Sequence, residues 1–140
     1  MRTTSLRNGL FGGALTFLAA IAPATAQDIR LGLIDMYGGN FAGQANAIRL
    51  GMQIALDEAN AAGVVKGHKL ALTSADMGTS VEKAITEARR MILDDKLHYV
   101  VVGSHSGAAV ALADLVRDKD VFGLGAFATT KRSFIADLRS

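Results

Sequence analysis

Apolar and polar residues recur along the chain with two different spacings, which predict strands and helices in turn. The residues from 29 to 36 are mostly apolar and are followed by Gly38-Gly39, which predicts a buried first strand. Between Ala42 and Ala62 polar side chains lie on one side of a helical wheel and apolar ones on the other, which predicts a long amphipathic helix ending at Gly63. The polar positions are Arg49, Gln53, Asp57 and Asn60, and the apolar ones are Ile48, Met52, Ala55 and Ala59.

The same succession continues to residue 125. Residues 69–76 alternate, which predicts a half-exposed strand at a sheet edge. Thr79 and Glu82 have the spacing of a capping box, so a second helix is expected to start near Ser80. Residues 99–103 are continuously apolar, as in a central parallel strand covered on both faces. A third helix is expected over residues 108–118 and a fourth strand over residues 121–125.

This order of elements, with its short connections, predicts the fold class. Strands that alternate with helices call for right-handed crossovers and an α/β fold, in three layers with a parallel sheet flanked by helices. In such an open sheet the ligand crevice lies beyond the carboxyl ends of the strands, near the point where the strand order reverses. The loops that qualify are residues 37–43, 104–107 and 126–131.

The first 26 residues have the pattern of a signal peptide. Arg2 and Arg7 form a basic head, residues 9–22 are apolar and uncharged, and small residues follow Pro23 up to Ala26. The apolar run is shorter than the ~20 residues that a membrane-spanning helix needs. We therefore expect cleavage after Ala26 and export of the mature protein.

Charge and cysteine content narrow the classes of protein further. The chain has no cysteine, so it has neither a lipid attachment site at the cleavage point nor disulfides, and its stability has to come from a hydrophobic core. Without Arg2 and Arg7, 13 basic residues stand against 13 acidic ones, with the two signs interspersed. A nucleic-acid-binding protein gathers its basic residues on one surface. Nucleic acid is therefore not an expected partner.

The loop Gly-Ser-His-Ser-Gly at residues 103–107 is the most informative candidate for chemistry. It joins a buried strand directly to a helix, whose N-terminus carries partial positive charge and free amides. A carboxylate or phosphate can therefore accept hydrogen bonds from the Ser106 hydroxyl and from nearby amides. Capping of the helix by Ser104 or Ser106 also explains the pattern without any ligand.

The sequence does not indicate catalysis or metal binding. A hydrolase elbow, G-x-S-x-G, has serine at its centre, whereas this loop has His105 there and no acid and base complete a triad. His68, His98 and His105 are widely separated and do not pair with acidic residues at metal-ligand spacing. We expect no enzymatic activity, no metal and no cofactor.

Three segments together resemble the Leu/Ile/Val-binding (type I) family of periplasmic binding proteins. They are IRLGLIDMYGGNFAGQANAIRLGMQIALDEANAAGVVKGHKLAL, SVEKAITEARRMI and YVVVGSHSGAAVALADLV. The most specific stretch is GMQIALDEANAAGVVKGHKL, which is similar to the family's usual run from the first helix into the second strand. The resemblance covers essentially all of residues 27–140.

The resemblance implies the flavodoxin-like, N-terminal lobe of a two-lobed domain, incomplete because the second lobe is lacking. It implies a monomer that captures a branched-chain or related amino acid in the periplasm and delivers it to the permease membrane subunits of an ABC transporter. An isolated lobe is expected to bind its ligand weakly, because closure of two lobes excludes water and strengthens polar contacts. The alternatives are an interaction or sensor module that docks on another envelope protein, or the product of a decayed gene.

The resemblance also assigns ligand-binding residues. It implies that Ser106 and Thr129 hold the α-carboxylate of an amino acid, and that the carbonyl of Phe127 accepts from its ammonium group. Gln44 occupies a place where an aromatic side chain often touches the ligand, and Phe127 is bulkier than the family's usual residue. The full set of predicted ligand-binding residues is Ser104, Ser106, Gly107, Phe127, Thr129 and Gln44.

Overall fold

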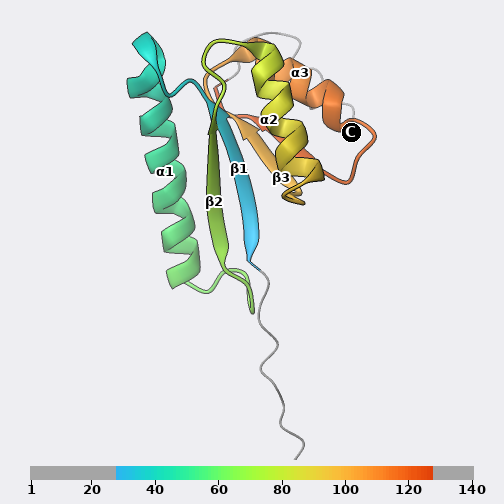
Figure 1. Cartoon of the computed structure of the whole chain (residues 1–140). Helices are drawn as coiled ribbons and strands as arrows, with labels where there is room; N and C mark the ends of the chain where they lie inside the picture. Colours follow the sequence, from blue (N-terminus) through green and yellow to red (C-terminus); the bar gives the residue numbers. More distant parts are fainter. Residues whose placement is uncertain (1–27, 128–140) are drawn as a thin grey trace, which may run out of the picture.

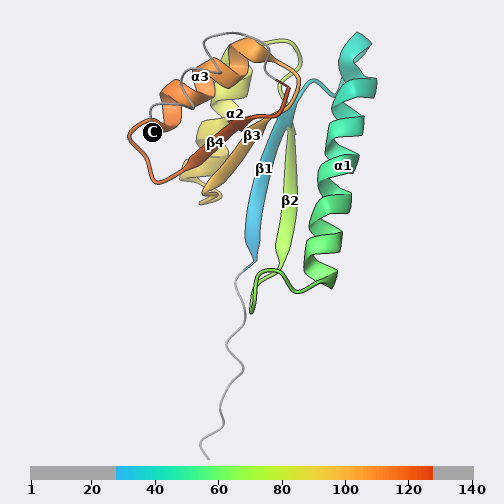
Figure 2. The same cartoon turned by 180° about the vertical axis from the view of Figure 1, so that it is seen from behind.

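The computed structural model describes residues 28–127 of the chain, so the predicted signal peptide and Thr129 lie outside the described residues. Four parallel strands form one sheet in the order β2-β1-β3-β4 (Figures 1 and 2). The strands are β1 (Ile29–Asp35), β2 (Leu70–Asp76), β3 (Tyr99–Val102) and β4 (Phe122–Gly125). The helices are the short 3-10 helix η1 (Gly39–Phe41), then α1 (Ala42–Ala61), α2 (Val81–Leu93) and α3 (Ser106–Val116).

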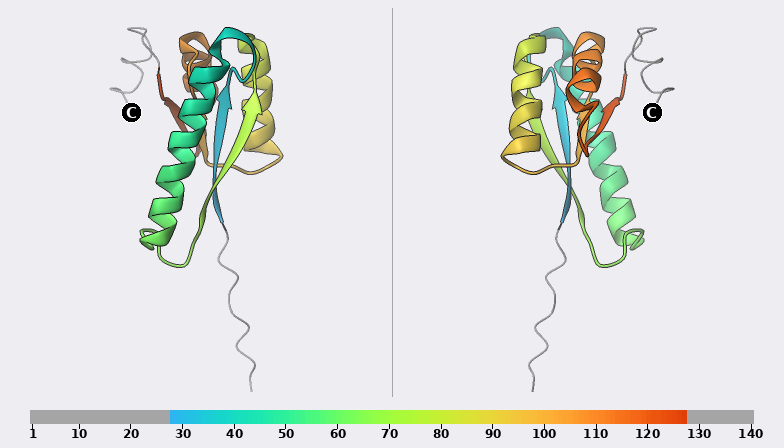
Figure 3. Two further views of the ribbon diagram at one scale, coloured as in Figure 1. Left: turned by 90° about the vertical axis from the view of Figure 1, so that its left-hand side faces the viewer. Right: turned by 90° about the vertical axis from the view of Figure 1, so that its right-hand side faces the viewer.

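The helices flank the sheet as the α/β prediction requires. Helix α1 lies on one side of the sheet, and α2 and α3 lie on the other (Figures 1 and 3). Strand β2 lies at an edge, and β3 lies between β1 and β4, which confirms both positions expected from the sequence. The fold class is therefore confirmed, with three layers and a parallel sheet.

The main core lies between the sheet and the pair of helices α2 and α3. Alanines on α2, Ala84 and Ala88, are almost fully buried and let this helix approach the sheet closely. Gly32 has the same effect on β1, because a Cβ atom there would lie 2.5 Å from the sulfur of Met91. The buried cluster consists of Ile34, Met36, Ala75, Met77, Ala84, Ala88, Met91, Leu97, Val100, Val102, Ala108, Ala109 and Leu112.

The side of the sheet that carries α1 is less completely covered. The pairing register places Leu33 of β1 beside Val101 of β3, and both are buried. Farther across this side, Tyr99, Phe122 and Leu124 are exposed, although they are large and apolar. Among the described elements, α1 packs on β2 and leaves β3 and β4 open on this side (Figure 3).

A side-chain amide ties α1 to the start of β2. The Asn60 Nδ2 donates to the carbonyl of Leu70, and the Leu70 amide donates to Asn60 Oδ1, both at 2.8 Å. The Asn60 side chain thus pairs with the backbone as a neighbouring strand would. Polar contacts therefore contribute to the docking of α1, whereas α2 and α3 dock through a large apolar cluster.

The start of α2 near Ser80 is confirmed, but its cap and the boundaries of α3 differ from the sequence predictions. Helix α2 is capped by Ser80, whose hydroxyl oxygen accepts from the Lys83 amide at 3.2 Å, so the capping box that the sequence placed on Thr79 is wrong by one residue. Helix α3 begins at Ser106, two residues earlier than predicted, and ends two residues earlier. In α1, Ala55 is exposed and its neighbour Leu56 is buried, because the buried stripe is rotated from the predicted one.

Candidate ligand-binding site

The strand order reverses between β1 and β3. Strand β1 connects through α1 to β2 on one side, and β3 connects through α3 to β4 on the other, so the connections diverge at this point (Figure 2). The carboxyl ends of two such strands flank a crevice in open parallel sheets. The backbone there is joined across strands, because the Gly103 amide donates to the carbonyl of Ile34 at 3.0 Å.

The loop after β4 lies beside the end of β3, at the same end of the sheet. The Ala126 amide donates to the carbonyl of Val102 at 2.9 Å, and the Phe127 amide donates to the carbonyl of Gly103 at 3.0 Å. Phe127 is therefore brought beside the loop between β3 and α3, as the site prediction requires. Its side chain is mostly exposed.

Helix α3 begins at this crevice. Ser106 is its first residue and is half-buried, and the first turn contains no acidic side chain that would offset the positive end of the helix. The cap is His105, whose Nδ1 accepts from the Ala108 amide at 3.1 Å. The reading in which Ser104 or Ser106 caps the helix is therefore wrong. An unprotonated imidazole nitrogen serves as the acceptor in place of a hydroxyl.

Gly107 leaves room for this cap. A Cβ atom at this position would lie 3.1 Å from Cε1 of His105, closer than most Cβ contacts. Gly107 itself is exposed in the first turn of α3. A glycine there keeps the helix tip accessible while the imidazole stays in place.

Ser104 has its donors directed into the protein. Its amide and its hydroxyl both donate to Oδ1 of Asp35, at 3.0 Å and 2.7 Å. The hydroxyl proton is therefore engaged, and Ser104 has only acceptor capacity left for a ligand. Its predicted ligand contact stays a prediction.

Of the remaining predicted residues, the structure describes only Gln44. Gln44 is exposed in the first turn of α1, at the same end of the sheet. Thr129 lies outside the described residues. The structure thus brings together Ser104, Ser106, Gly107 and Phe127, and no hydrogen bond within residues 28–127 joins Gln44 to them.

Asp35 is the residue that sequence reasoning missed. It ends β1 and is fully buried. The available signal was a carboxylate at the end of an otherwise apolar strand, because a buried carboxylate there requires hydrogen-bond donors from neighbouring loops.

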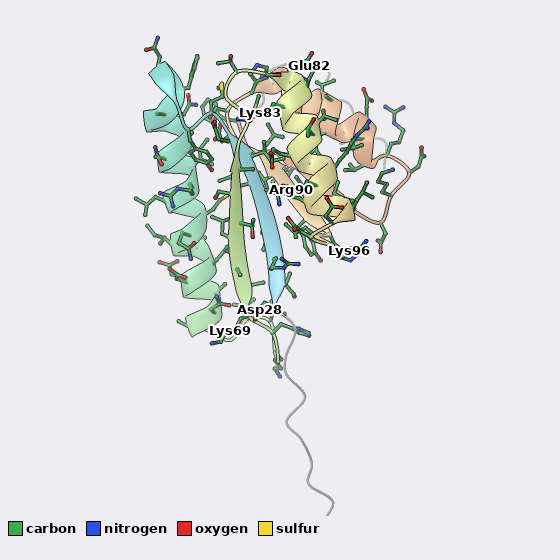
Figure 4. The ribbon with its side chains drawn as sticks, in the orientation of Figure 1. Asp28, Lys69, Glu82, Lys83, Arg90 and Lys96 are labelled. Carbon is green, nitrogen blue, oxygen red and sulfur yellow. The ribbon has the colours of Figure 1, made fainter. Side chains whose placement is uncertain are left out.

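A second carboxylate organises the neighbouring strand end. Asp76 accepts from the amides of Tyr37 and Gly78 at 3.0 and 3.1 Å and pairs with Lys83 at 3.3 Å. Lys83 lies near the start of α2 (Figure 4). The hydrogen bond from Gly78, followed by that from Tyr37, lowers the pKa of Asp76 below its usual value. Burial raises the pKa of the Tyr37 phenol. The loops at this end of the sheet are therefore held by Asp35 and Asp76, whose carboxylates accept hydrogen bonds from backbone amides.

Residues 28–127 contain neither a side-chain cluster that could hold a metal ion nor a helix that could span a membrane. No group of three or more histidine, cysteine, aspartate or glutamate side chains in this range is placed to hold a metal ion. No helix within the same range has the length and apolar character needed to cross a membrane.

The sequence matches a family model described as "Periplasmic binding protein" over residues 28–135. The Leu/Ile/Val-binding protein BraC3 of Rhizobium johnstonii is 30% identical over 125 residues, which cover 86% of this chain and 34% of that protein. Leu/Ile/Val-binding protein homolog 7 of Brucella melitensis is 35% identical over 113 residues, covering 79% of this chain and 28% of that protein. The chain thus spans about a third of the length of these relatives.

Solved structures share the fold. The branched-chain amino acid transporter substrate-binding protein LivJ of Streptococcus pneumoniae, in complex with isoleucine, matches with a TM-score of 0.65 and 23% identity, over 76% of this chain and 30% of that one. A solute-binding protein of an ABC transporter from Rhodopseudomonas palustris, in complex with 4-hydroxybenzoate, matches with a TM-score of 0.68 and 21% identity, over 78% of this chain and 29% of that one. These matches identify the observed sheet and helices as part of a type I periplasmic binding protein fold.

Proposed function

Because the chain belongs to the periplasmic binding protein family, we propose that it serves as part of the substrate-binding component of an ABC transporter. Its ligand is a branched-chain or related amino acid, captured reversibly in the periplasm after export. The partners are the permease membrane subunits that receive the ligand. No bond is made or broken, in keeping with the named relatives, which are binding proteins.

One observation carries this proposal, namely that α3 begins at the switch point of the sheet with no acidic side chain in its first turn. Ser106 is the first residue of this helix. Amides and a hydroxyl at a helix N-terminus suit a carboxylate, since the helix end carries partial positive charge.

The ligands of the related structures support the same chemistry. Isoleucine and 4-hydroxybenzoate, which the Streptococcus and Rhodopseudomonas proteins hold, share a carboxyl group and little else. A site that recognises the carboxylate at the tip of α3 accounts for this common feature. The Leu/Ile/Val-binding relatives favour an amino acid over a benzoate for this chain.

Titration of the isotope-labelled chain with leucine, followed by amide NMR shifts, tests the proposal. We expect saturable shifts centred on the amides of residues 106–108. The expected dissociation constant is about 1 mM or weaker, which corresponds to a favourable binding free energy of at most about 4 kcal/mol. The variant Ser106→Ala should weaken the response, and 4-hydroxybenzoate should bind less well than leucine. No response at these amides to either compound, or a response confined to another surface, would contradict the proposal.

One observation favours the alternative of an interaction module. Tyr99, Phe122 and Leu124 leave an apolar area exposed beside α1, and such areas mark surfaces that bind other proteins. Sedimentation of the chain at increasing concentration separates the two functions. An interaction module of this kind self-associates through that area or fails to respond to leucine, whereas the binding protein remains monomeric and responds.

A further inference from the structure

Asp35 is the one buried charged side chain in the part of the chain that the structure describes. A carboxylate removed from water costs free energy unless hydrogen bonds compensate for it. Asp35 lies at the end of β1 among apolar neighbours, Ile34 and Met36, which are buried as well. Its place in the interior therefore depends on the hydrogen bonds that Oδ1 accepts, because Oδ2 is buried without a hydrogen-bond partner among the described residues.

Three donors converge on one oxygen of this carboxylate. Oδ1 accepts from the amide of Met36 at 2.8 Å, from the amide of Ser104 at 3.0 Å and from the hydroxyl of Ser104 at 2.7 Å. Two of the three donors belong to a residue 69 positions away in the sequence. Asp35 therefore joins the end of β1 to the loop that precedes α3.

The backbone opposite Asp35 is shaped to receive it. A Cβ atom at Gly103 would lie 1.8 Å from Oδ2 of Asp35 and 2.4 Å from its Cγ, so a side chain at position 103 is incompatible with the carboxylate in this place. The amide of Gly103 also donates to the carbonyl of Ile34. The carboxylate on β1 and the glycine on β3 thus form a matched pair.

From these contacts we propose that Asp35 is the positioning residue of the ligand site and acts through Ser104. Asp35 holds the residue two positions before the start of α3, His105 caps the helix, and together they fix where the amides of the helix tip point. Fixed donors bind a carboxylate better than donors that must be ordered on binding. Recognition of the ligand then rests on Ser106 and the Gly107 amide, because the Ala108 amide donates to His105, and Ser104 donates to Asp35 rather than to the ligand.

This inference rests on the proposed function, but its first test needs no ligand. In the full chain, Asp35→Ala should speed hydrogen exchange of the Ser104 amide about tenfold or more and shift its resonance, because a bond to a charged acceptor is lost. Asp35→Asn keeps an Oδ1 acceptor and should restore most of the protection. Asp76→Asn is the matched control, since Asp76 pairs with Asp35 in the strand register and should leave Ser104 unchanged.

The second test uses leucine as the probe. Asp35→Ala should raise the dissociation constant about tenfold, Ser104→Ala by a smaller factor, and the double variant no more than Asp35→Ala alone, because residues that act as one unit are not additive. Additive effects would show that Ser104 contacts the ligand independently and would overturn the proposal.

Failure of the positioning role and failure of the proposed function can be told apart. If the Asp35→Ala chain is unfolded, Ser104→Ala decides, and wild-type affinity for leucine in that variant contradicts the positioning role. If the wild-type chain does not respond to leucine, the proposed function fails with this probe. In that case, loss of Ser104 protection in Asp35→Ala and its recovery in Asp35→Asn still support the role of Asp35 in fixing the loop, and unchanged protection refutes it.

Discussion

The two sides of the sheet differ in how completely they are covered. Toward α2 and α3, a continuous cluster of buried residues joins both helices to three strands. Toward α1, the buried strand residues are Leu33 and Asp35 of β1 and Val101 of β3, whereas Tyr99, Phe122 and Leu124 remain exposed on β3 and β4. The difference indicates that the stability of this unit resides mainly on the α2 and α3 side, while the α1 side contributes less and depends more on polar contacts.

The largest effect is expected from a cavity on the covered side. Met91 of α2 is fully buried and its sulfur packs against Gly32 of β1, so Met91→Ala should reduce the free energy of unfolding by about 2–5 kcal/mol. Leu93→Ala is a matched control on the same helix, since Leu93 is 56% exposed and its truncation should cost far less. Urea denaturation followed by circular dichroism measures both. Equal losses would contradict the assignment of the core to this side.

A smaller effect is expected where α1 is tied to β2. Asn60→Ala removes both hydrogen bonds to Leu70 and should cost about 1–2 kcal/mol, because water can replace part of what is lost. Asn46→Ala, which removes a bond between an exposed side chain and the carbonyl of Ala42 within α1, provides the comparison and should cost less. Hydrogen exchange of the Leu70 amide, read by NMR, locates the effect. No difference between the two variants would show that apolar packing alone docks α1.

The exposed strand residues on the α1 side of the sheet should tolerate polar substitution. Phe122 is 57% exposed, so Phe122→Ser should change the free energy of unfolding by about 0.5 kcal/mol or less, as is usual for surface positions. The same change at Leu112, which is almost fully buried on the other side, should unfold a large fraction of the chain. Thermal melts of the two variants compare the sides directly. A strong destabilisation by Phe122→Ser would mean that this side is covered after all.

The smallest effect concerns acid stability at the strand ends. Because the folded-state pKa of Asp76 is lowered below its ordinary value of 3.8, its ionised form stabilises the fold above that value, and the contribution is lost as the pH falls through the lowered pKa. Asp76 is largely exposed, so the contribution is small. Asp76→Asn should lower stability slightly at neutral pH and make it less dependent on pH below 4. A steeper acid dependence in this variant would reverse the predicted sign.

Local patterns predicted most of the fold. The unbroken apolar run at residues 99–103 identified a central strand, and the alternation at residues 69–76 identified an edge strand. The start of α3 was missed, because histidine is not a usual N-cap and the capping role of His105 depends on the orientation of its ring. The site prediction named Ser104, Ser106, Gly107 and Phe127, which the structure brings together. It did not identify Asp35, because two of the hydrogen-bond donors to Asp35 belong to a residue 69 positions away in the sequence.

What the sequence determined by itself is therefore the succession of strands and helices and the family to which it belongs. Strand and helix periods are properties of the local backbone, so they can be seen in the order of apolar and polar residues. Only the tertiary structure decided that a carboxylate on β1 faces a glycine on β3, that Ser104 turns its donors inward, and that the helices of residues 28–127 leave part of one side of the sheet open. These features depend on the register of parallel strands joined by long crossovers, and no local pattern specifies that register.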